Sequence, residues 1–351
     1  MKPKIVIADV RSINRNGKMT GHYLNLAQNY IDVLSTEFDV FIAGGPIYKD
    51  KFHNYLELPF DVCLSDSALL NKVKAIINCL VLFRKTKHYT IILQSNAVVT
   101  TFFAMLLSPF RRRLFMIQYN TMALDSKLKR FLHCLVKTRI TGVLCPSAEI
   151  GKQYCSNYLV VPDYIVTPKQ IDELSRSKTQ EKIYDIAIVG IITPDKGIIQ
   201  SAEKLSQTKY HVLIAGRPVS LEIEKELRAI CEGHDNIVLK LEYIDDAEYD
   251  TYIRKSRYCL LNYTDAYSEH SSGVIFDALY RGTPIIGRKC RFLQIVADEN
   301  MGHLYDDIST CDFEKLFEEE KMQEYEYEIY RYLNKELKNI EILRSYLKET
   351  L

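Results

Sequence analysis

Short apolar runs alternate with longer amphipathic segments along the 351 residues of the chain. The runs are rich in Val, Ile and Leu and show no polar alternation, which is typical of parallel strands covered by helices on both faces. In the first half they are residues 5–8, 38–43, 89–93, 114–119, 142–144 and 158–161. In the second half they are residues 184–189, 211–215, 237–241, 258–261 and 284–286. Each set predicts a doubly wound α/β sheet.

A polar segment, residues 166–182, separates the two sets and contains Pro168 among Lys, Gln, Glu, Ser and Thr. We therefore predict two Rossmann-like domains, residues 1–165 and 183–330, joined by this linker. Residues 331–351 read as a helix in which Leu and Ile recur at spacings of three and four, forming one apolar stripe. That stripe needs a partner surface, and one option is that the helix packs back on the N-terminal domain.

Composition adds limits on location and chemistry. The chain is 47% hydrophobic and 26% charged, as is ordinary for a globular protein. Its nine cysteines include no C-x2-C pair, so no zinc or redox motif is present. The most apolar stretch, residues 97–110, is shorter than the roughly 20 residues that span a bilayer. The N-terminal apolar run, cut by Asp9, is too short for a signal peptide. We expect a cytoplasmic protein, with peripheral contact at the inner membrane face as an extension.

The near-zero net charge conceals an asymmetry. Residues 1–160 contain 21 Lys and Arg against 10 Asp and Glu, whereas the remainder contains 25 against 35. A basic first half favours an anionic partner such as a phospholipid surface. The run Arg111-Arg112-Arg113 lies beside the apolar stretch 97–110. The alternative is a solvated basic face with no special partner.

Four glycine-bearing turns follow predicted strands and suit phosphate binding. A glycine lets the backbone approach an anion, and a following helix offers free N–H groups with the positive end of its dipole. Ligands of open α/β sheets bind at such loops. The turns contain Gly21-His22, Gly190 through Lys196-Gly197, Gly216-Arg217 and Ser272-Gly273-Val274.

Two acidic residues frame the last of these turns. Glu269 would lie in the loop, and Asp277, eight residues later, on the helix that starts at the glycine turn. Two carboxylates so placed could straddle one ligand and accept hydrogen bonds from sugar or ribose hydroxyls.

This arrangement resembles the E-x7-E motif of family-4 retaining glycosyltransferases of the GT-B fold, with Asp in the second acidic position. The matching residues are Glu269, Gly273, Asp277, Ala278, Leu279, Gly282 and Pro284. The segments Gly190 to Gly197, 211–216, 243–248, 256–261 and 301–305 resemble further landmarks of that family in the same order. The resemblance covers the second half, and the first half matches only loosely.

The resemblance implies two Rossmann-like domains facing a cleft, with a nucleotide-sugar donor on the second. Glu269 and Lys196 would be the catalytic residues, Glu269 holding the sugar and Lys196 contacting the donor phosphates. The donor site would comprise Gly190, Lys196, Arg217, Ser272, Gly273, Val274 and Asp277, with Asp277 on the ribose. Because no Asp-x-Asp motif can be placed near a strand end, we expect neither a metal nor another cofactor.

The sequence departs from the family pattern at two positions. Ile191 stands where the family usually has a phosphate-binding arginine, which leaves that charge to Lys196 unless Arg217 or Arg254 contributes. Asn120 stands where an N-domain histidine is common. Gly21, His22 and Asn120 are the expected residues on the acceptor side.

We therefore expect transfer of a sugar, with retention of configuration, to a saccharide or lipid-linked acceptor such as a cell-surface polysaccharide precursor. Nucleic acid is not an expected partner. Two alternatives stay open at this point: a GT-B nucleotide-sugar epimerase, and a non-catalytic GT-B subunit, which the two departures would suit.

Overall fold

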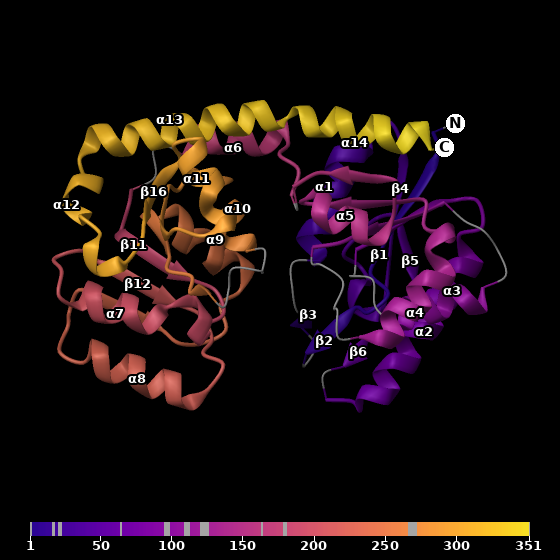
Figure 1. Ribbon diagram of the computed structural model, residues 1–351, viewed down its shortest axis with the longest axis horizontal. Helices are drawn as coiled ribbons and strands as arrows, with labels where there is room; N and C mark the ends of the chain where they lie inside the picture. Colours follow the sequence, from indigo (N-terminus) through magenta and orange to yellow (C-terminus); the bar gives the residue numbers. More distant parts are fainter. Residues whose placement is uncertain are drawn as a thin grey trace. The chain divides into compact units, whose positions relative to one another are not determined.

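The chain folds into two compact units. The computed structural model describes residues 2–15, 18–19, 23–63, 65–94, 99–108, 113–119, 126–162, 164–177, 181–265 and 272–350. Unit 1 comprises Met1–Thr167 together with Leu337–Leu351, and unit 2 comprises Pro168–Glu336 (Figure 1). The fold class predicted from the sequence, α/β with two doubly wound parallel sheets, is confirmed.

Unit 1 contains a seven-stranded parallel sheet in the order β10-β9-β8-β7-β1-β4-β5. Its strands are β1 (Lys4–Ala8), β4 (Asp39–Gly44), β5 (Tyr55–Glu57), β7 (Thr90–Leu93), β8 (Leu114–Ile117), β9 (Gly142–Cys145) and β10 (Tyr158–Val160). A smaller sheet, ordered β3-β2-β6, is formed by β2 (Ile13–Arg15), β3 (Lys18–Met19) and β6 (Val62–Cys63). The helices are α1 (Tyr23–Leu34), α2 (Ala68–Lys85), α3 (Val99–Leu107), α4 (Lys127–Val136), α5 (Ala148–Tyr154) and α14 (Lys338–Glu349).

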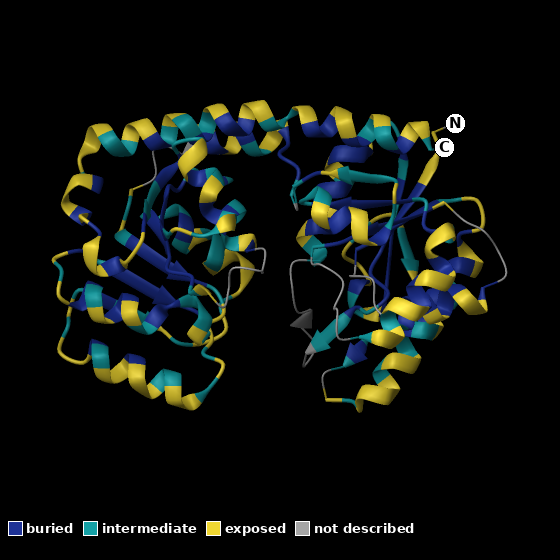
Figure 2. Cartoon of the chain, viewed as in Figure 1, coloured by how far each residue is buried: buried dark blue, intermediate teal, exposed yellow. Residues whose placement is uncertain are grey.

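The alternation of side chains along β1 shows how this sheet is buried on both faces. Val6 and Ala8 pack into a core shared with α2, α3, α4 and α5. Ile5 and Ile7 pack into a second core shared with α1 and α14. The central strands are accordingly dark blue in Figure 2, whereas the edge strands β5 and β10 are only partly buried and the outer sides of the helices are exposed. The apolar runs of the sequence are continuous because both faces of each strand need apolar side chains.

Unit 2 contains a six-stranded parallel sheet in the order β13-β12-β11-β14-β15-β16. Its strands are β11 (Tyr184–Val189), β12 (Val212–Ala215), β13 (Ile237–Lys240), β14 (Ser256–Leu261), β15 (Ile285–Arg288) and β16 (Gly302–Tyr305). The helices are α6 (Pro168–Ser177), α7 (Ile198–Ser206), α8 (Leu221–Cys231), α9 (Asp246–Arg254), α10 (Gly273–Leu279), α11 (Gln294–Asp298), α12 (Phe313–Leu316) and α13 (Glu319–Glu336).

The segment predicted as a linker, residues 166–182, is instead largely helical. Helix α6 begins at Pro168, a residue suited to the first turn because it lacks an N–H group. Its apolar residues Ile171 and Leu174, three apart, are buried although the rest of the segment is polar. Leu174 also lies against the turn at Gly282. This part of the expected linker therefore belongs to unit 2.

The C-terminal segment, expected as one helix over residues 331–351, is shared between the units. Helix α13 ends at Glu336 in unit 2, and α14 begins at Lys338 in unit 1. The apolar stripe is divided accordingly, because Leu333 is buried in unit 2 whereas Ile340, Leu343 and Leu347 enter the core of unit 1 around α1. None of the helices within the described ranges is long and apolar enough to cross a membrane.

Candidate functional site

Four neighbouring strands of unit 2 end at one edge of the sheet, and two of the predicted site residues, Gly190 and Gly216, lie there. Gly190 follows β11, Gly216 follows β12, Asn262 follows β14, and Arg288 ends β15. Because the strands are parallel, these ends share one edge of the sheet, where open α/β sheets bind ligands.

The first two of these loops touch through their main chains. Gly190 has a φ of +106° and Gly216 a φ of +151°, both outside the range that other residues adopt easily. A Cβ atom at position 216 would lie 1.7 Å from the carbonyl oxygen of Gly190. The N–H of Ile192 donates to the carbonyl of Arg217 at 3.0 Å, and that of Val219 to Ile192 at 3.1 Å. Glycine is therefore required where these loops meet.

Lys196 ends a 3-10 turn, Pro194–Lys196, that is fastened to the end of β14. Both the N–H and the hydroxyl of Thr264 donate to the carbonyl of Asp195 at 2.9 Å. The side-chain amide of Asn262 donates to the carbonyl of Gly197 at 3.0 Å. A Cβ atom at Gly190 would lie 3.7 Å from Lys196 Nζ and 3.8 Å from Val274 Cγ2. The structure thus brings together Gly190 and Lys196, from one predicted turn, and Val274, from another.

The ammonium group of Lys196 is electrostatically unusual. Burial lowers its pKa below the ordinary value of 10.5, against the opposing effects of Asp195 and Cys259. Within the described ranges, its Nζ has neither a hydrogen bond nor an ion pair. A mostly buried cation that has no partner among the described residues is a candidate for binding an anion.

Helix α10 begins beside this lysine. Ser272 is its N-cap residue, yet its side chain does not cap the helix, because the hydroxyl is hydrogen-bonded to the hydroxyl of Tyr263. The first N–H groups of a helix have no intrahelical acceptor. Those of Gly273 and Val274 are thus available to an anion next to Lys196.

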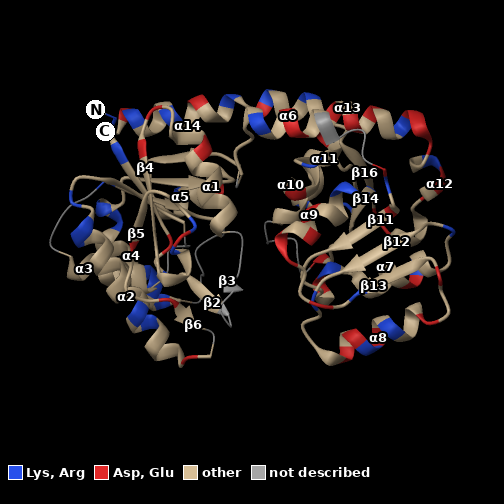
Figure 3. Ribbon diagram, turned by 180° about the vertical axis from the view of Figure 1, so that it is seen from behind, with Lys and Arg blue, Asp and Glu red and all other residues tan. Residues whose placement is uncertain are grey.

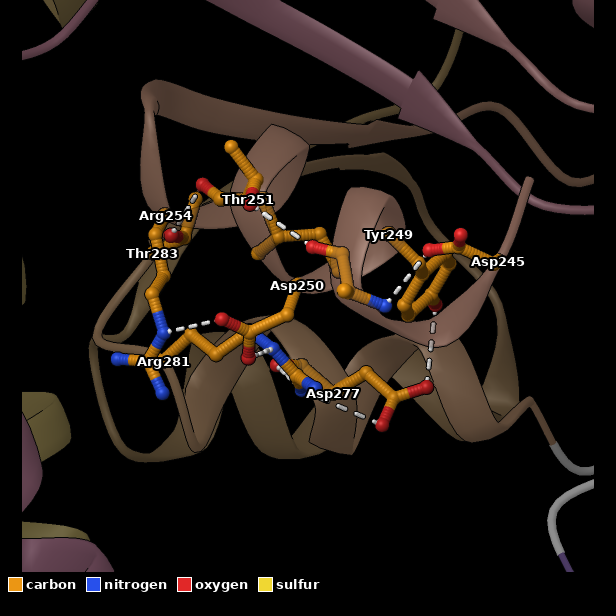
Figure 4. Close-up of polar contacts among 10 residues, drawn as sticks. Asp245, Tyr249, Asp250, Thr251, Arg254, Asp277, Arg281 and Thr283 are labelled. Atoms are coloured by element: carbon orange, nitrogen blue, oxygen red, sulfur yellow. Dashed lines mark hydrogen bonds and ion pairs between the residues drawn. The ribbon is translucent and has the colours of Figure 1, made fainter.

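Asp277 lies one turn further along α10 and is held by two neighbours (Figure 4). The buried hydroxyl of Tyr249 donates to Oδ2 at 3.0 Å. Arg281 Nη1 lies 3.4 Å from Oδ1 and donates to the carbonyl of Asp277 at 2.8 Å, while its Nε pairs with Asp250 at 2.7 Å. Burial and the Asp277 charge raise the pKa of Tyr249 well above its ordinary value. Tyr249 therefore stays a neutral donor to Asp277.

The buried thiol of Cys259, on β14, lies within electrostatic range of both Lys196 and Asp277. Burial raises its pKa to about 12, with Asp277 raising it further and Lys196 opposing the rise. Lys196 and Asp277 therefore act on the same buried thiol. Arg217 differs from these residues because its side chain is exposed. Its main-chain carbonyl, not its side chain, accepts the hydrogen bond from Ile192.

The other expected site residues lie outside the described residues. They are Glu269, Gly21, His22 and Asn120. Within the described ranges, no group of three or more His, Cys, Asp or Glu side chains is placed to hold a metal ion.

Three buried polar residues at the carboxyl ends of strands in unit 1 were not predicted as functional. The carboxylate of Asp9, after β1, accepts bonds from the N–H groups of Arg11 and Ser12 and from the hydroxyl of Tyr48. Gln94 follows β7 and Gln118 follows β8, and each is 1% exposed. In the described part of the chain, the side-chain amide nitrogen and oxygen of Gln94 both lack a hydrogen-bond partner. The side-chain amide nitrogen of Gln118 also lacks one. The sequence signal that could have identified these three residues is a single polar residue directly after an apolar strand.

Several solved structures share this architecture. A glycosyltransferase from Rickettsia africae is similar over 99% of each chain, with 12% identity and a TM-score of 0.66. HepE of Anabaena, in complex with UDP-glucose, is similar over 99% of this chain and all of its own, with 14% identity and a TM-score of 0.65. A trehalose-phosphate synthase from Burkholderia xenovorans, in complex with glucose-6-phosphate, is similar over 99% of each chain, with 9% identity and a TM-score of 0.69.

No family model and no curated protein matches the sequence itself. The agreement with these structures extends over nearly every residue of the chain and includes both parallel sheets. The chain therefore has the fold of GT-B glycosyltransferases.

Proposed function

We propose that the chain is a glycosyltransferase that moves a sugar from a nucleotide-sugar donor to an acceptor. The observation that carries this proposal is the mostly buried Lys196 ammonium beside Gly190 and the first N–H groups of α10. A diphosphate bound there would supply the anion that this edge of the sheet is arranged to accept. The UDP-glucose in the similar Anabaena structure supports a donor of this class.

The proposed roles follow from the charge that develops during transfer. As the bond from the anomeric carbon to phosphate breaks, negative charge grows on the leaving diphosphate. Lys196 and the N–H groups of Gly273 and Val274 would stabilise that charge. The acceptor hydroxyl forms the new glycosidic bond and passes its proton to the oxygen of the leaving diphosphate, and the nucleoside diphosphate departs.

Glu269 is proposed to hold the sugar and Asp277 the ribose, as in the E-x7-E arrangement. A carboxylate has about four lone-pair sites, so the contacts of Asp277 with Tyr249 and Arg281 leave capacity for a hydroxyl group. We further propose retention of configuration, with attack from the face of the leaving group, and no metal ion or other cofactor. The finer assignment to the family-4 type rests on the sequence resemblance.

The acceptor is proposed to be a lipid-linked saccharide on the way to a cell-surface polysaccharide. The basic first half of the sequence supports it, because such carriers have an anionic pyrophosphate in an anionic leaflet.

A panel of nucleotide-sugars tests the reaction class. We expect one donor to raise the melting temperature of the protein. Free nucleoside diphosphate should be released from that donor only when an acceptor is added. The initial rate of this release should be the same with and without excess chelator. An isomerised donor would indicate an epimerase, and the absence of any binding would indicate a non-catalytic subunit. A rate lost with chelator and restored by manganese would contradict the metal-free mechanism.

Glu269→Gln tests the acidic motif. The substitution keeps the shape of the side chain and removes its charge, so the sugar hydroxyls lose a charge-assisted acceptor worth about 1.5–3 kcal/mol, roughly tenfold to a hundredfold in kcat/KM. Steady-state kinetics with the identified donor measures the change. Glu242→Gln, which alters an exposed acid after β13, is the control. Unchanged kinetics in the Glu269 variant would show that the motif is misassigned.

A further inference from the structure

Exposed apolar side chains of this protein concentrate on three neighbouring helices. Among the described residues, ten of the eighteen large hydrophobic side chains that are exposed lie on α2, α3 and α4. The remaining eight are scattered over both units. Single exposed apolar residues are normal on a soluble protein, but a contiguous group marks an interaction surface.

Helix α2 shows the pattern most clearly. Leu69, Val73 and Ile77 recur every four residues and form a stripe on one side of the helix, with Leu70 beside them. Leu69 is 74% exposed. The opposite side of the helix, including Cys79 and Leu82, is buried in the core of unit 1. The helix is therefore apolar on its outer side as well as on its inner side.

Helices α3 and α4 continue this stripe. The outer residues of α3 are Phe103, Leu106 and Leu107, and those of α4 are Leu128, Phe131 and Leu135. All three helices bury their inner sides in the same core, and α3 packs against both α2 and α4. Their outer sides therefore form one continuous layer, here called the α2–α4 face, which is exposed in Figure 2.

The charges around this face have one sign. The sequence contains no acidic residue between Asp66 and Asp125, and the carboxylate of Asp66 is paired with Lys74 at 2.6 Å. Lys72 is exposed on α2, Arg113 precedes β8, and Lys127 and Arg130 flank Leu128 on α4. In Figure 3 the three helices are mainly tan and blue.

We propose that the α2–α4 face docks on a membrane surface rich in anionic phospholipids. Apolar side chains would enter the boundary between headgroups and acyl chains, and the lysine and arginine side chains would reach the phosphates. A second copy of the chain fits less well, because a two-fold contact would set this basic face against itself. The inference rests on the proposed function in one respect: the membrane bound by this face would be the place from which a lipid-linked acceptor reaches the protein.

Vesicle co-sedimentation tests the surface without any need for turnover. We expect the chain to bind vesicles of equal parts phosphatidylglycerol and phosphatidylcholine, and to bind phosphatidylcholine vesicles at least tenfold more weakly. Binding should weaken as salt rises, because the screening length falls to about 10 Å at 0.1 M. Equal or negligible binding to both kinds of vesicle would overturn the proposal.

A paired substitution locates the contact. Leu128→Glu with Phe131→Glu changes two exposed positions of α4 and leaves its buried residues Leu132 and Val136 in place. We expect at least tenfold weaker vesicle binding, with unchanged circular dichroism. The matched control is Leu221→Glu on α8, which alters a leucine that is 60% exposed in unit 2 and should not affect binding. Equal loss in both variants would overturn the assignment to this face.

Cys134 supplies a second measurement that needs no change to the face. It is the exposed cysteine of α4 and lies between Phe131 and Leu135. The half-buried cysteines are first replaced by serine, and an environment-sensitive fluorophore is attached to Cys134. The fluorescence emission of this label should shift to shorter wavelength when anionic vesicles are added. The emission of a label on Leu221→Cys, in the same background with Cys134 also replaced by serine, should not shift.

Two further outcomes distinguish membrane docking from self-association and from failure of the proposed reaction. Concentration-dependent dimerisation in ultracentrifugation, lost in the paired variant, would replace the membrane with a second copy. Release of nucleoside diphosphate with a water-soluble acceptor should be the same in the paired variant and the wild type. Failure of vesicle binding with this release intact would overturn the docking surface and leave the proposed reaction standing.

Discussion

Replacing Lys196 with methionine is expected to weaken donor binding strongly while raising the melting temperature of the chain without ligand. The ammonium is mostly buried, and its pKa is lowered chiefly by desolvation. A lysine whose pKa is lower in the folded state than in the unfolded state destabilises the fold at every pH where both states hold the proton. The penalty disappears only above the ordinary value of 10.5, where both states are neutral. At neutral pH, methionine removes the penalty and fills the same space.

The same substitution removes the positive charge beside Gly190 and α10. Removing one preorganised group that stabilises transition-state charge costs about 10²–10³-fold in rate. We therefore expect a loss of this size in kcat/KM, measured by nucleotide release, and a loss of donor affinity in calorimetric titration. In the wild type, affinity should decline with rising pH before ordinary lysines titrate. Lys225→Met, on the exposed side of α8, is the control. Unchanged donor affinity, or a lower melting temperature, would contradict this role of Lys196.

Gly216→Ala is expected to destabilise unit 2 strongly. The new Cβ would lie 1.7 Å from the carbonyl oxygen of Gly190, and a main-chain atom cannot rotate away as a side chain can. The loops would have to separate, which breaks the two hydrogen bonds of Ile192 at about 1 kcal/mol each. The positive φ adds about 1–3 kcal/mol. The total of about 3–5 kcal/mol corresponds to a fall of about 6–20 °C in melting temperature for a unit of this size.

Gly233→Ala isolates the conformational part of that effect. Gly233 also has a positive φ, of +77°, but a Cβ atom there would meet nothing within 4 Å. We expect only the strain cost of about 1–2 kcal/mol in this variant. Scanning calorimetry of both variants separates the contact from the strain. Similar melting of the two would mean that the loops do not need their close approach. In the Gly216 variant, donor binding should also be weaker because Gly190 is displaced.

Much of the fold was predictable because parallel strands buried on both faces leave a continuous apolar signature. The eleven runs predicted from the sequence all coincide with strands of the two large sheets. The predicted runs do not include β2, β3, β5, β6 and β16, which are short or only partly buried and so lack that signature. Helix α6 was missed because only Ile171 and Leu174 mark its buried side.

The candidate site was predictable as a set of motifs, and its electrostatics were not. Glycine turns after strands placed Gly190, Gly216 and Gly273 at one edge of the sheet from topology alone. Arg281 lies four residues after Asp277, just beyond the end of α10, and this spacing of opposite charges could have predicted their pairing. Tyr249 comes from another helix, and the burial of Lys196 depends on how three loops pack. Such long-range contacts leave no local pattern in the sequence.

The division of the C-terminal helices has a consequence for synthesis on the ribosome. Unit 2 is one uninterrupted segment, whereas unit 1 takes its last helix, α14, from residues made after all of unit 2. The core of unit 1 around α1 lacks Ile340, Leu343 and Leu347 until α14 has been synthesised. The unit whose synthesis starts first is therefore completed last, because α14 is made after every residue of unit 2.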